Sequence, residues 1–183
     1  MNRKQRILVI GIAFLIVCAS LGVTSAKTLY VDDDGGYDFT RIQEAIDEAS
    51  PGDTIFVYNG TYEENLEIDK GNLTIVGENR DKVIIDGKKG HNTIYIDVRV
   101  NNIKISEFTI QNGYDNIYVA GSNFNCARCK ILNGSNGITI TEPNCNISEC
   151  IVMNHHYRGI DLSSHNTIVR NNIILNCNFN LFS

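Results

Sequence analysis

The chain has 183 residues, and 21 acidic against 16 basic side chains give it a net charge of −5. This length is ample for one domain with a continuous hydrophobic core. The acidic balance argues against a nucleic-acid partner, because such binding depends on Lys and Arg side chains that neutralise phosphates.

Residues 1–26 have the features of a secretory signal peptide. Three basic residues precede an apolar run over 7–17, and three small residues close the segment. Such a segment is removed on export, which would bring the net charge to −8, since 13 cations remain against 21 anions. We therefore expect a secreted or periplasmic protein with no membrane segment beyond the signal. A lipoprotein modified at Cys18 and an uncleaved membrane anchor are the alternatives.

Residues 27–90 are expected to form an N-terminal cap and the first coils of the fold. After a first strand, a helix is predicted to start at Thr40, and Gln43 stands three places later, where it would complete a capping box. Pro51 and the glycine after it end the helix. An amphipathic helix at this point would cover the open end of a stack of strands.

Three consecutive aspartates, residues 32–34, lie between the first strand and the helix. Their carboxylates could bind calcium, but the spacing of an EF-hand loop is absent and a solvated turn is the simpler interpretation. No other cofactor is expected. Three short alternating strands follow the helix, over 54–58, 65–68 and 73–76.

The remaining segment, residues 91–183, repeats at an interval of 21 to 22 residues. Each repeat holds three short runs of period-two alternation, which is typical of half-buried strands. Such repeats bury their apolar faces only by stacking on one another. One polar residue recurs in every repeat, two places after an apolar strand residue: Asn112, Asn133, Asn154 and Asn176.

This pattern predicts an all-β fold, a right-handed, single-stranded parallel β-helix with about 21 to 22 residues per coil. The spacing of the asparagine does not fit a leucine-rich repeat. We expect the four asparagines to form a ladder in which each amide contacts the next coil at the strand spacing of about 4.8 Å. Their side chains are expected to point inward and to satisfy buried corner groups.

Five cysteines lie in the repeat region. Cys126 and Cys129 have the CxxC spacing of redox and zinc sites, but their columns hold apolar residues in the other repeats. We therefore expect buried cysteines that fill the core. A disulfide between Cys129 and Cys150 and a metal site are the alternatives; we expect no metal.

Outward positions on the third strand of each coil carry aromatic and acidic residues. Tyr95, Tyr118 and Asp161 alternate with apolar residues that should face the core, and Tyr114 and Tyr157 lie at the corners before them. Aromatic faces beside polar groups suit sugar rings, which combine apolar C–H faces with hydroxyls. These five residues are the predicted ligand-binding surface.

One compact set has general acid/base potential: His155, His156, Arg158 and Asp161. These four are weak candidates for catalysis, because the acidic residues of the later coils fall in different columns. The two adjacent histidines would point in opposite directions on an extended strand and lack a third ligand for a metal.

The run from Thr28 to Gly87, with the coil segments GITITEP (137–143) and GIDLSSHNTIVRNNI (159–173), resembles the NosD-type and CASH-domain β-helix proteins of the pectin-lyase-like superfamily. The resemblance covers nearly all of the chain after the signal and implies a carbohydrate or cell-surface ligand. This scaffold carries lyases, esterases, epimerases and surface proteins. Pectin methylesterases of the superfamily use two neighbouring Asp residues and an Arg, and no such trio is evident in the sequence.

We therefore expect a secreted or cell-surface β-helix protein that acts as a non-catalytic carbohydrate-binding or structural module. A polysaccharide lyase or epimerase-like enzyme is the first alternative, and a NosD-like periplasmic factor for copper-site maturation is the second. The last coil ends in apolar residues. We expect either that the natural chain continues beyond it or that this coil docks on a partner.

Overall fold

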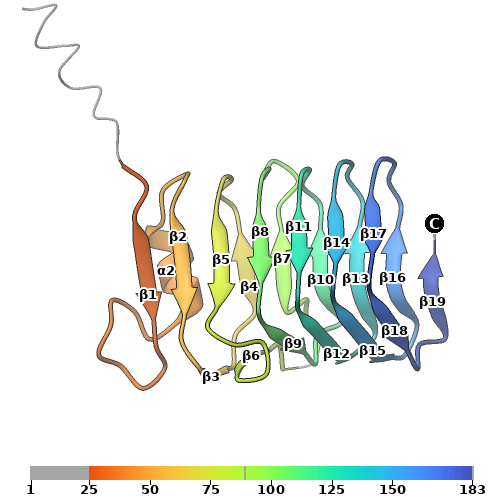
Figure 1. Cartoon of the computed structure of the whole chain (residues 1–183), viewed down its shortest axis with the longest axis horizontal. Helices are drawn as coiled ribbons and strands as arrows, with labels where there is room; N and C mark the ends of the chain where they lie inside the picture. The colour runs from red at the N-terminus through yellow and green to blue at the C-terminus, as the bar shows by residue number, and fades with distance from the viewer. Residues whose placement is uncertain (1–24, 89, 183) are drawn as a thin grey trace, which may run out of the picture.

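The computed structural model describes residues 25–88 and 90–182, which form a solenoid of stacked coils (Figure 1). The predicted signal peptide, residues 1–26, lies outside the described residues apart from its last two. Within the described residues, no helix is long and apolar enough to cross a membrane.

The coils contribute strands to three parallel sheets, here called sheets A, B and C. Sheet A contains β1 (Thr28–Val31), β2 (Thr54–Val57), β5 (Thr74–Gly77), β8 (Lys104–Ser106), β11 (Asn125–Ala127), β14 (Asn146–Ser148) and β17 (Ile168–Arg170). Sheet B contains β3 (Gly60–Tyr62), β6 (Val83–Asp86), β9 (Thr109–Gln111), β12 (Lys130–Gly134), β15 (Ile151–His155) and β18 (Ile173–Leu175). Sheet C contains β4 (Leu66–Ile68), β7 (Ile94–Ile96), β10 (Asp115–Val119), β13 (Asn136–Ile140), β16 (Arg158–Leu162) and β19 (Phe179–Phe182).

Equivalent residues of successive coils pair in register along each sheet. Ile117 pairs with Ile138, and Ile138 with Ile160, so the sequence repeat becomes a column of side chains. The inward columns are almost entirely Ile, Val, Leu, Phe and Cys, and they form one continuous core. The predicted right-handed parallel β-helix is confirmed.

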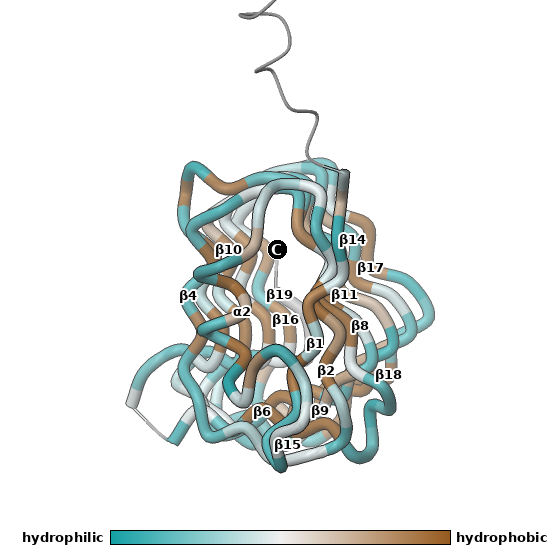
Figure 2. Tube along the Cα trace, turned by 90° about the vertical axis from the view of Figure 1, so that its left-hand side faces the viewer, coloured by the Kyte–Doolittle hydropathy of each residue, from teal (hydrophilic) through white to brown (hydrophobic). Residues whose placement is uncertain are grey.

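Helix α2 (Ile42–Glu48) covers the N-terminal end of the solenoid, which faces the viewer in Figure 2. The capping helix is confirmed, but the capping box predicted between Thr40 and Gln43 is not formed. Instead the buried carboxylate of Glu64 accepts the backbone N–H groups of Ile42, at 2.9 Å, and of Gln43, at 3.1 Å. Glu64 belongs to the next coil, so the helix is capped by a residue distant in sequence.

Each regular coil turns three corners, and each corner contains one residue in the left-handed region. These residues recur at the repeat interval and have φ between 51° and 65°. Asparagine is common among them because its short polar side chain tolerates this conformation. The three columns are Asn102, Asn123, Asn144 and Asn166; Glu107, Arg128, Glu149 and Asn171; and Asn112, Asn133, Asn154 and Asn176.

The predicted asparagine ladder lies at the corner between sheets B and C. Asn154 Nδ2 donates to Asn133 Oδ1 at 3.4 Å, and Asn176 Nδ2 donates to Asn154 Oδ1 at 3.2 Å. Asn112 Nδ2 instead donates to Asp86 Oδ2 at 2.8 Å. The expected inward orientation is wrong, because Asn112 is half-buried and the other three side chains are exposed. The left-handed corner turns each side chain outward, so the ladder borders a surface groove.

Four of the cysteines in the repeat region are buried in the core, and no disulfide joins the described cysteines. The sulfur of Cys126 lies 3.8 Å from that of Cys150, which is a contact between thiols and not a covalent bond. Burial among apolar neighbours raises the pKa of Cys145. These residues therefore pack as small hydrophobic side chains.

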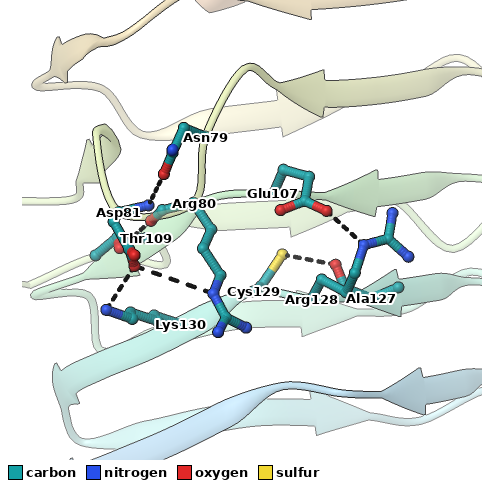
Figure 3. Close-up of polar contacts among 9 residues, drawn as sticks. All are labelled: Asn79, Arg80, Asp81, Glu107, Thr109, Ala127, Arg128, Cys129 and Lys130. Atoms are coloured by element: carbon teal, nitrogen blue, oxygen red, sulfur yellow. Dashed lines mark hydrogen bonds and ion pairs between the residues drawn. The ribbon is translucent and has the colours of Figure 1, made fainter.

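Charged residues at the corner between sheets A and B link successive coils (Figure 3). Arg128 forms an ion pair with Glu107, and Lys130 Nζ lies 2.6 Å from Asp81 Oδ1. Thr109 Oγ1 donates to the carbonyl oxygen of Arg80 at 2.6 Å. The Arg128 and Thr109 contacts join adjacent coils, and the ion pair between Lys130 and Asp81 spans two coils, on the side of the solenoid away from sheet C.

Candidate functional site

Polar side chains gather on the outer side of sheet C, on strands β10, β13 and β16. Asp115 pairs in register with Asn136, and Thr139 pairs with Asp161. Arg158 follows in the next coil, where its backbone N–H donates to Asn136 Oδ1 at 3.2 Å. We call these five residues the acid–arginine site.

Strand β10 departs from regular alternation next to this site. Asn116 is fully buried, and its Oδ1 accepts the backbone N–H of Gly113 at 2.8 Å. Its Nδ2 donates to the carbonyl oxygen of Leu132 at 2.8 Å and lies 3.0 Å from His155 Nε2. Asn116 and Ile117 are adjacent in sequence, yet both side chains are buried in the core, so the alternation is broken here. As a result Asp115 lies beside the outward-facing Thr139.

Asp115 is buried, with only 5% of the residue exposed. Burial raises its pKa, and the nearby negative charge of Asp161 raises it further. Asn136 Nδ2 donates to Asp115 Oδ1 at 2.6 Å, which offsets part of this effect on the pKa, as does the neighbouring Thr139 hydroxyl. Asp115 therefore holds a proton more readily than an ordinary aspartate does, which is a requirement for a general acid.

Asp161 is also 5% exposed, but its environment differs. Arg158 Nη1 donates to Asp161 Oδ2, and the guanidinium group of Arg158 extends to the surface with 38% of its side chain exposed. The other carboxylate oxygen, Oδ1, is buried without a hydrogen-bond partner. The site thus places Asp115, whose pKa is raised, near a second buried aspartate that forms an ion pair with Arg158.

Two grooves border the acid–arginine site. The nearer has a volume of about 300 Å³ and is lined by Tyr114, Asn136, Tyr157, Arg158 and Phe179. Its three aromatic side chains are each more than half exposed. The second, of about 590 Å³, runs along the asparagine ladder and shares Tyr114 with the first. An extended ligand lying across Tyr114 would contact both grooves.

The predicted ligand-binding residues lie on the outer side of sheet C and along its border. Tyr95 and Tyr118 pair in register, and their rings stack with centroids 5.8 Å apart and planes at 20°. The column continues through Thr139 to Asp161. Exposed Tyr114 and Tyr157 line the grooves described above. Whether these residues bind a ligand remains a prediction.

The four predicted catalytic residues do not form one cluster. His155 is 2% exposed, and burial lowers its pKa to about 4. His156 is exposed and lines the larger groove, whereas Arg158 and Asp161 form the ion pair of the acid–arginine site. The expected compact set is therefore wrong for His155, because the strand turns this residue into the core.

Sequence reasoning missed Asp115, Asn136 and Thr139 as members of the site. It also found no pair of aspartates with an arginine, although the structure brings Asp115, Asp161 and Arg158 together on one side of sheet C. The repeat could have placed Thr139 beside Asp161, because the two residues occupy equivalent positions one coil apart. Asp115 could not be placed in this way, since its strand departs from alternation at the next residue.

The acidic turn at residues 32–34 is interpreted as a solvated turn, with calcium binding as the alternative. Asp32, Asp33 and Asp34 carry carboxylate oxygens that all lie within 4.8 Å of one another, and they form the one such group among the described residues. Asp32 is half-buried and the other two are exposed. Exposed acidic turns of this kind are common without an ion.

The chain is similar to curated pectinesterases over part of its length. It is 46% identical over 68 residues to probable pectinesterase/pectinesterase inhibitor 17 of Arabidopsis thaliana, a match that covers 36% of this chain and 13% of that protein. It is 32% identical over 124 residues to pectinesterase A of Dickeya chrysanthemi, covering 55% of this chain and 33% of that protein. The chain thus spans a third or less of these relatives. No protein-family model matches it.

Solved structures with similar folds include a pectin methylesterase from carrot, with a TM-score of 0.56, 20% identity, and coverage of 75% of this chain and 55% of that one. A pectin methylesterase variant in complex with a hexasaccharide matches with a TM-score of 0.51 and 16% identity, and the match covers 70% of this chain and 55% of that one. An alginate lyase from Paenibacillus sp. str. FPU-7 matches with a TM-score of 0.52 and 14% identity, and the match covers 80% of this chain and 65% of that one. At these identities the likeness concerns the fold.

The similarity to pectinesterases contradicts the expected non-catalytic binding module, because these relatives are named as enzymes. It favours the alternative, a carbohydrate-active enzyme. The narrower resemblance to NosD-type and CASH-domain proteins is not singled out by these matches. They show that the chain shares the parallel β-helix fold of these solved structures.

Proposed function

We propose that this protein is a carbohydrate-active enzyme that hydrolyses carboxyl esters on an acidic, pectin-like polysaccharide. The observation that carries the proposal is the pair of buried carboxyl groups on the outer side of sheet C, Asp115 and Asp161, with Arg158 beside them. The names of its pectinesterase relatives supply the substrate class. An exported protein would meet such a polymer outside the cell, which agrees with the predicted signal peptide.

The two carboxyl groups suit different steps of ester hydrolysis. Asp115, whose pKa is raised by burial, can donate a proton to the leaving alcohol oxygen. Asp161 is held by Arg158 and presents its other oxygen as the basic or nucleophilic group. An opposite assignment would require Asp115, whose pKa is raised, to act as the base.

The surroundings of the pair suit a chain of acidic sugars. The partly exposed guanidinium group of Arg158 can pair with a free uronate carboxylate as well as with Asp161. The exposed rings of Tyr114, Tyr157 and Phe179 offer apolar faces on which sugar rings can stack. The described grooves are open, as a polymer substrate requires.

A lyase is the second candidate, because the fold also matches an alginate lyase over 80% of the chain. Lyases act on the same class of acidic polymer but cleave its backbone and leave an unsaturated sugar. The resemblance to NosD-type and CASH-domain proteins extends over nearly all of the chain after residue 26 and stays a proposal about ancestry.

Methanol release from methyl-esterified pectin tests the proposal, and absorbance of unsaturated products from polygalacturonate and alginate tests the lyase. We expect methanol release by the wild-type protein and a loss on the order of 10²-fold or more in Asp115→Asn and Asp161→Asn, as for removal of a general acid or base. Asp81→Asn, an exposed carboxylate at the corner between sheets A and B, is the matched control. A folded wild-type protein that releases no methanol contradicts the esterase, and unsaturated products would establish the lyase.

A further inference from the structure

Four aromatic side chains lie together on the outer side of sheet A, at the N-terminal end of the solenoid. We call them the aromatic platform: Tyr30 on β1, Tyr37 in the loop that follows it, Phe56 on β2 and Tyr58 just after β2. The rings of Tyr37 and Tyr58 stack with their centroids 4.2 Å apart, and the Tyr30 ring lies 6.0 Å from that of Tyr37. Tyr30 is 39% exposed and Tyr37 50%, so the platform presents ring surface to solvent.

The stacking of the coils does not require these rings. Along sheet A, the column that begins with Tyr30 and Phe56 continues with small, aliphatic or charged residues: Val76, Ser106, Ala127, Ser148 and Arg170. The aromatic residues of this column are thus confined to the first coils, on the face of the sheet that points away from the core. Exposed apolar side chains gathered at one place on a surface indicate a binding site.

Hydrogen bonds hold the loop that carries Tyr37 in place. Asp38 Oδ2 accepts the backbone N–H of Tyr30 at 3.0 Å, and the backbone N–H of Phe39 donates to the carbonyl oxygen of Tyr30 at 3.1 Å. Asp33 Oδ2 accepts the backbone N–H of Thr61 at 3.0 Å. A platform that is ordered before binding loses less conformational entropy when a ligand docks on it.

A groove of about 520 Å³ lies beside the platform, since Asp38, one of its lining residues, directly follows Tyr37 in the chain. The other lining residues are Lys27, Thr28, Leu29, Phe39 and Glu48. The carboxylates of this groove accept hydrogen bonds, the Lys27 ammonium group donates them, and the Thr28 hydroxyl does both. A sugar hydroxyl also donates and accepts, so this mixture suits a hydroxyl-rich ligand better than a purely cationic one.

The surroundings of the platform are acidic. Four of the seven residues 32–38 are aspartates and none is basic, and the negative charge of Glu78 lies near Tyr58. Negative charge repels the carboxylates of a uronate chain. The exposed tyrosines beside the acid–arginine site instead share their groove with Arg158. The chemistry of the two aromatic surfaces thus favours different sugars, acidic ones near Arg158 and neutral ones at the platform.

We propose that the aromatic platform and the groove beside it bind a neutral polysaccharide, whose sugar rings stack on Tyr30 and Tyr37 while its hydroxyl groups bond to the groove. This inference goes beyond the proposed ester hydrolysis and does not depend on it. Figure 2 shows sheet A, with β2, β8 and β11, and sheet C, with β4 and β10, on opposite sides of the solenoid. A neutral chain bound to the platform therefore leaves the grooves beside the acid–arginine site open, and the protein stays attached to one polymer while it acts on another.

Affinity gel electrophoresis with soluble xyloglucan, galactomannan and arabinan tests this binding, and polygalacturonate serves as the acidic comparison. The assay needs no catalytic activity, so its outcome is independent of the proposed ester hydrolysis. We expect at least one neutral polymer to retard the wild-type protein, and we expect added NaCl to leave this retardation unchanged, because the ligand carries no charge. Absence of retardation by all three neutral polymers overturns the inference.

Substitutions in the platform test where the polymer binds. Tyr37→Ala and Tyr30→Ala should each weaken binding on the order of tenfold, since each removes one stacking ring, whereas Tyr37→Phe keeps the ring and should bind nearly as the wild-type protein does. Tyr157→Ala is the matched control, because this tyrosine has a similar exposed fraction, 53%, but lines the groove beside Arg158. Circular dichroism and the melting temperature verify that each variant is folded.

Three results would overturn the assignment of the platform. The first is unchanged binding in both alanine variants, and the second is an equal loss in Tyr157→Ala. The third is evidence for another occupant: retardation that NaCl abolishes would reveal a charged ligand, and a dimer in solution that Tyr37→Ala dissociates would reveal a second copy of the chain.

Discussion

Acid sensitivity of folding should depend on His155, a buried imidazole next to the strand that carries Asp115. Asn116 Nδ2 donates to His155 Nε2 at 3.0 Å, and the orientation of this amide is fixed because Gly113 N–H donates to its Oδ1. His155 Nδ1 lies 3.7 Å from the sulfur of Cys177. Nε2 must therefore remain unprotonated to accept its hydrogen bond, and burial lowers the pKa of His155 to about 4.

The size of the effect follows from linkage. The unfolded chain binds a proton at His155 below the usual imidazole pKa of about 6.5, whereas the folded chain binds it only near 4. The stability that this residue contributes is present above pH 6.5 and is lost as the pH falls toward 4. At about 1.4 kcal/mol per pKa unit, the free energy of unfolding should fall by roughly 3 kcal/mol across this window.

Urea unfolding at pH 7, 5.5 and 4 measures this loss in the wild-type protein and in His155→Gln. Glutamine still offers an oxygen to Asn116 but does not titrate, so the variant should lose about 3 kcal/mol less than the wild-type protein between pH 7 and pH 4. His156→Gln, at the exposed neighbouring position, should keep the wild-type pH dependence. Equal pH dependence in the wild-type protein and His155→Gln would refute the reasoning.

Two further predictions concern buried carboxyl groups. Glu64→Gln removes the charged acceptor of two N–H groups at the start of α2, and urea unfolding at pH 7 should show a loss of about 1 to 2 kcal/mol; no loss would contradict the capping role. Asp115 has a raised pKa, so it contributes stability at low pH that is lost as the pH rises through the folded pKa. Asp115→Asn should therefore raise the melting temperature at pH 7 but not at pH 3, and an equal change at both would contradict this assignment.

The sequence predicted the β-helix because its periodicity maps directly onto register. An interval of 21 or 22 residues brings Ile117, Ile138 and Ile160 into one column, and alternation within each run assigns that column to the core. These inferences need only the repeat interval, which sets the register, and the period-two alternation, which sets the face of each strand. The capping helix followed from its apolar face, but its cap did not, because Glu64 is far from α2 in the sequence.

Orientation at the corners could not be predicted in the same way. A repeat shows that Asn133 and Asn154 occupy equivalent positions, but it does not show the sign of φ that turns both outward. The same limit applies to His155, which was grouped with His156, Arg158 and Asp161 as a candidate for catalysis although its side chain lies in the core. Period-two alternation assigns a face only within a regular strand, and the candidate site lies where the strands stop being regular.

The acid–arginine site is therefore linked to packing on the inner side of sheet C. Asn116 enters the core from β10, and the next two coils have glycine in this column, Gly137 and Gly159. A Cβ atom on Gly137 would lie 2.3 Å from the carbonyl oxygen of Gly159 and 2.8 Å from Val152 Cγ1, so a side chain here would force β13 and β16 apart. These are the strands that carry Thr139 and Asp161. The close approach that glycine permits inside the solenoid thus sets the spacing of the polar groups outside it.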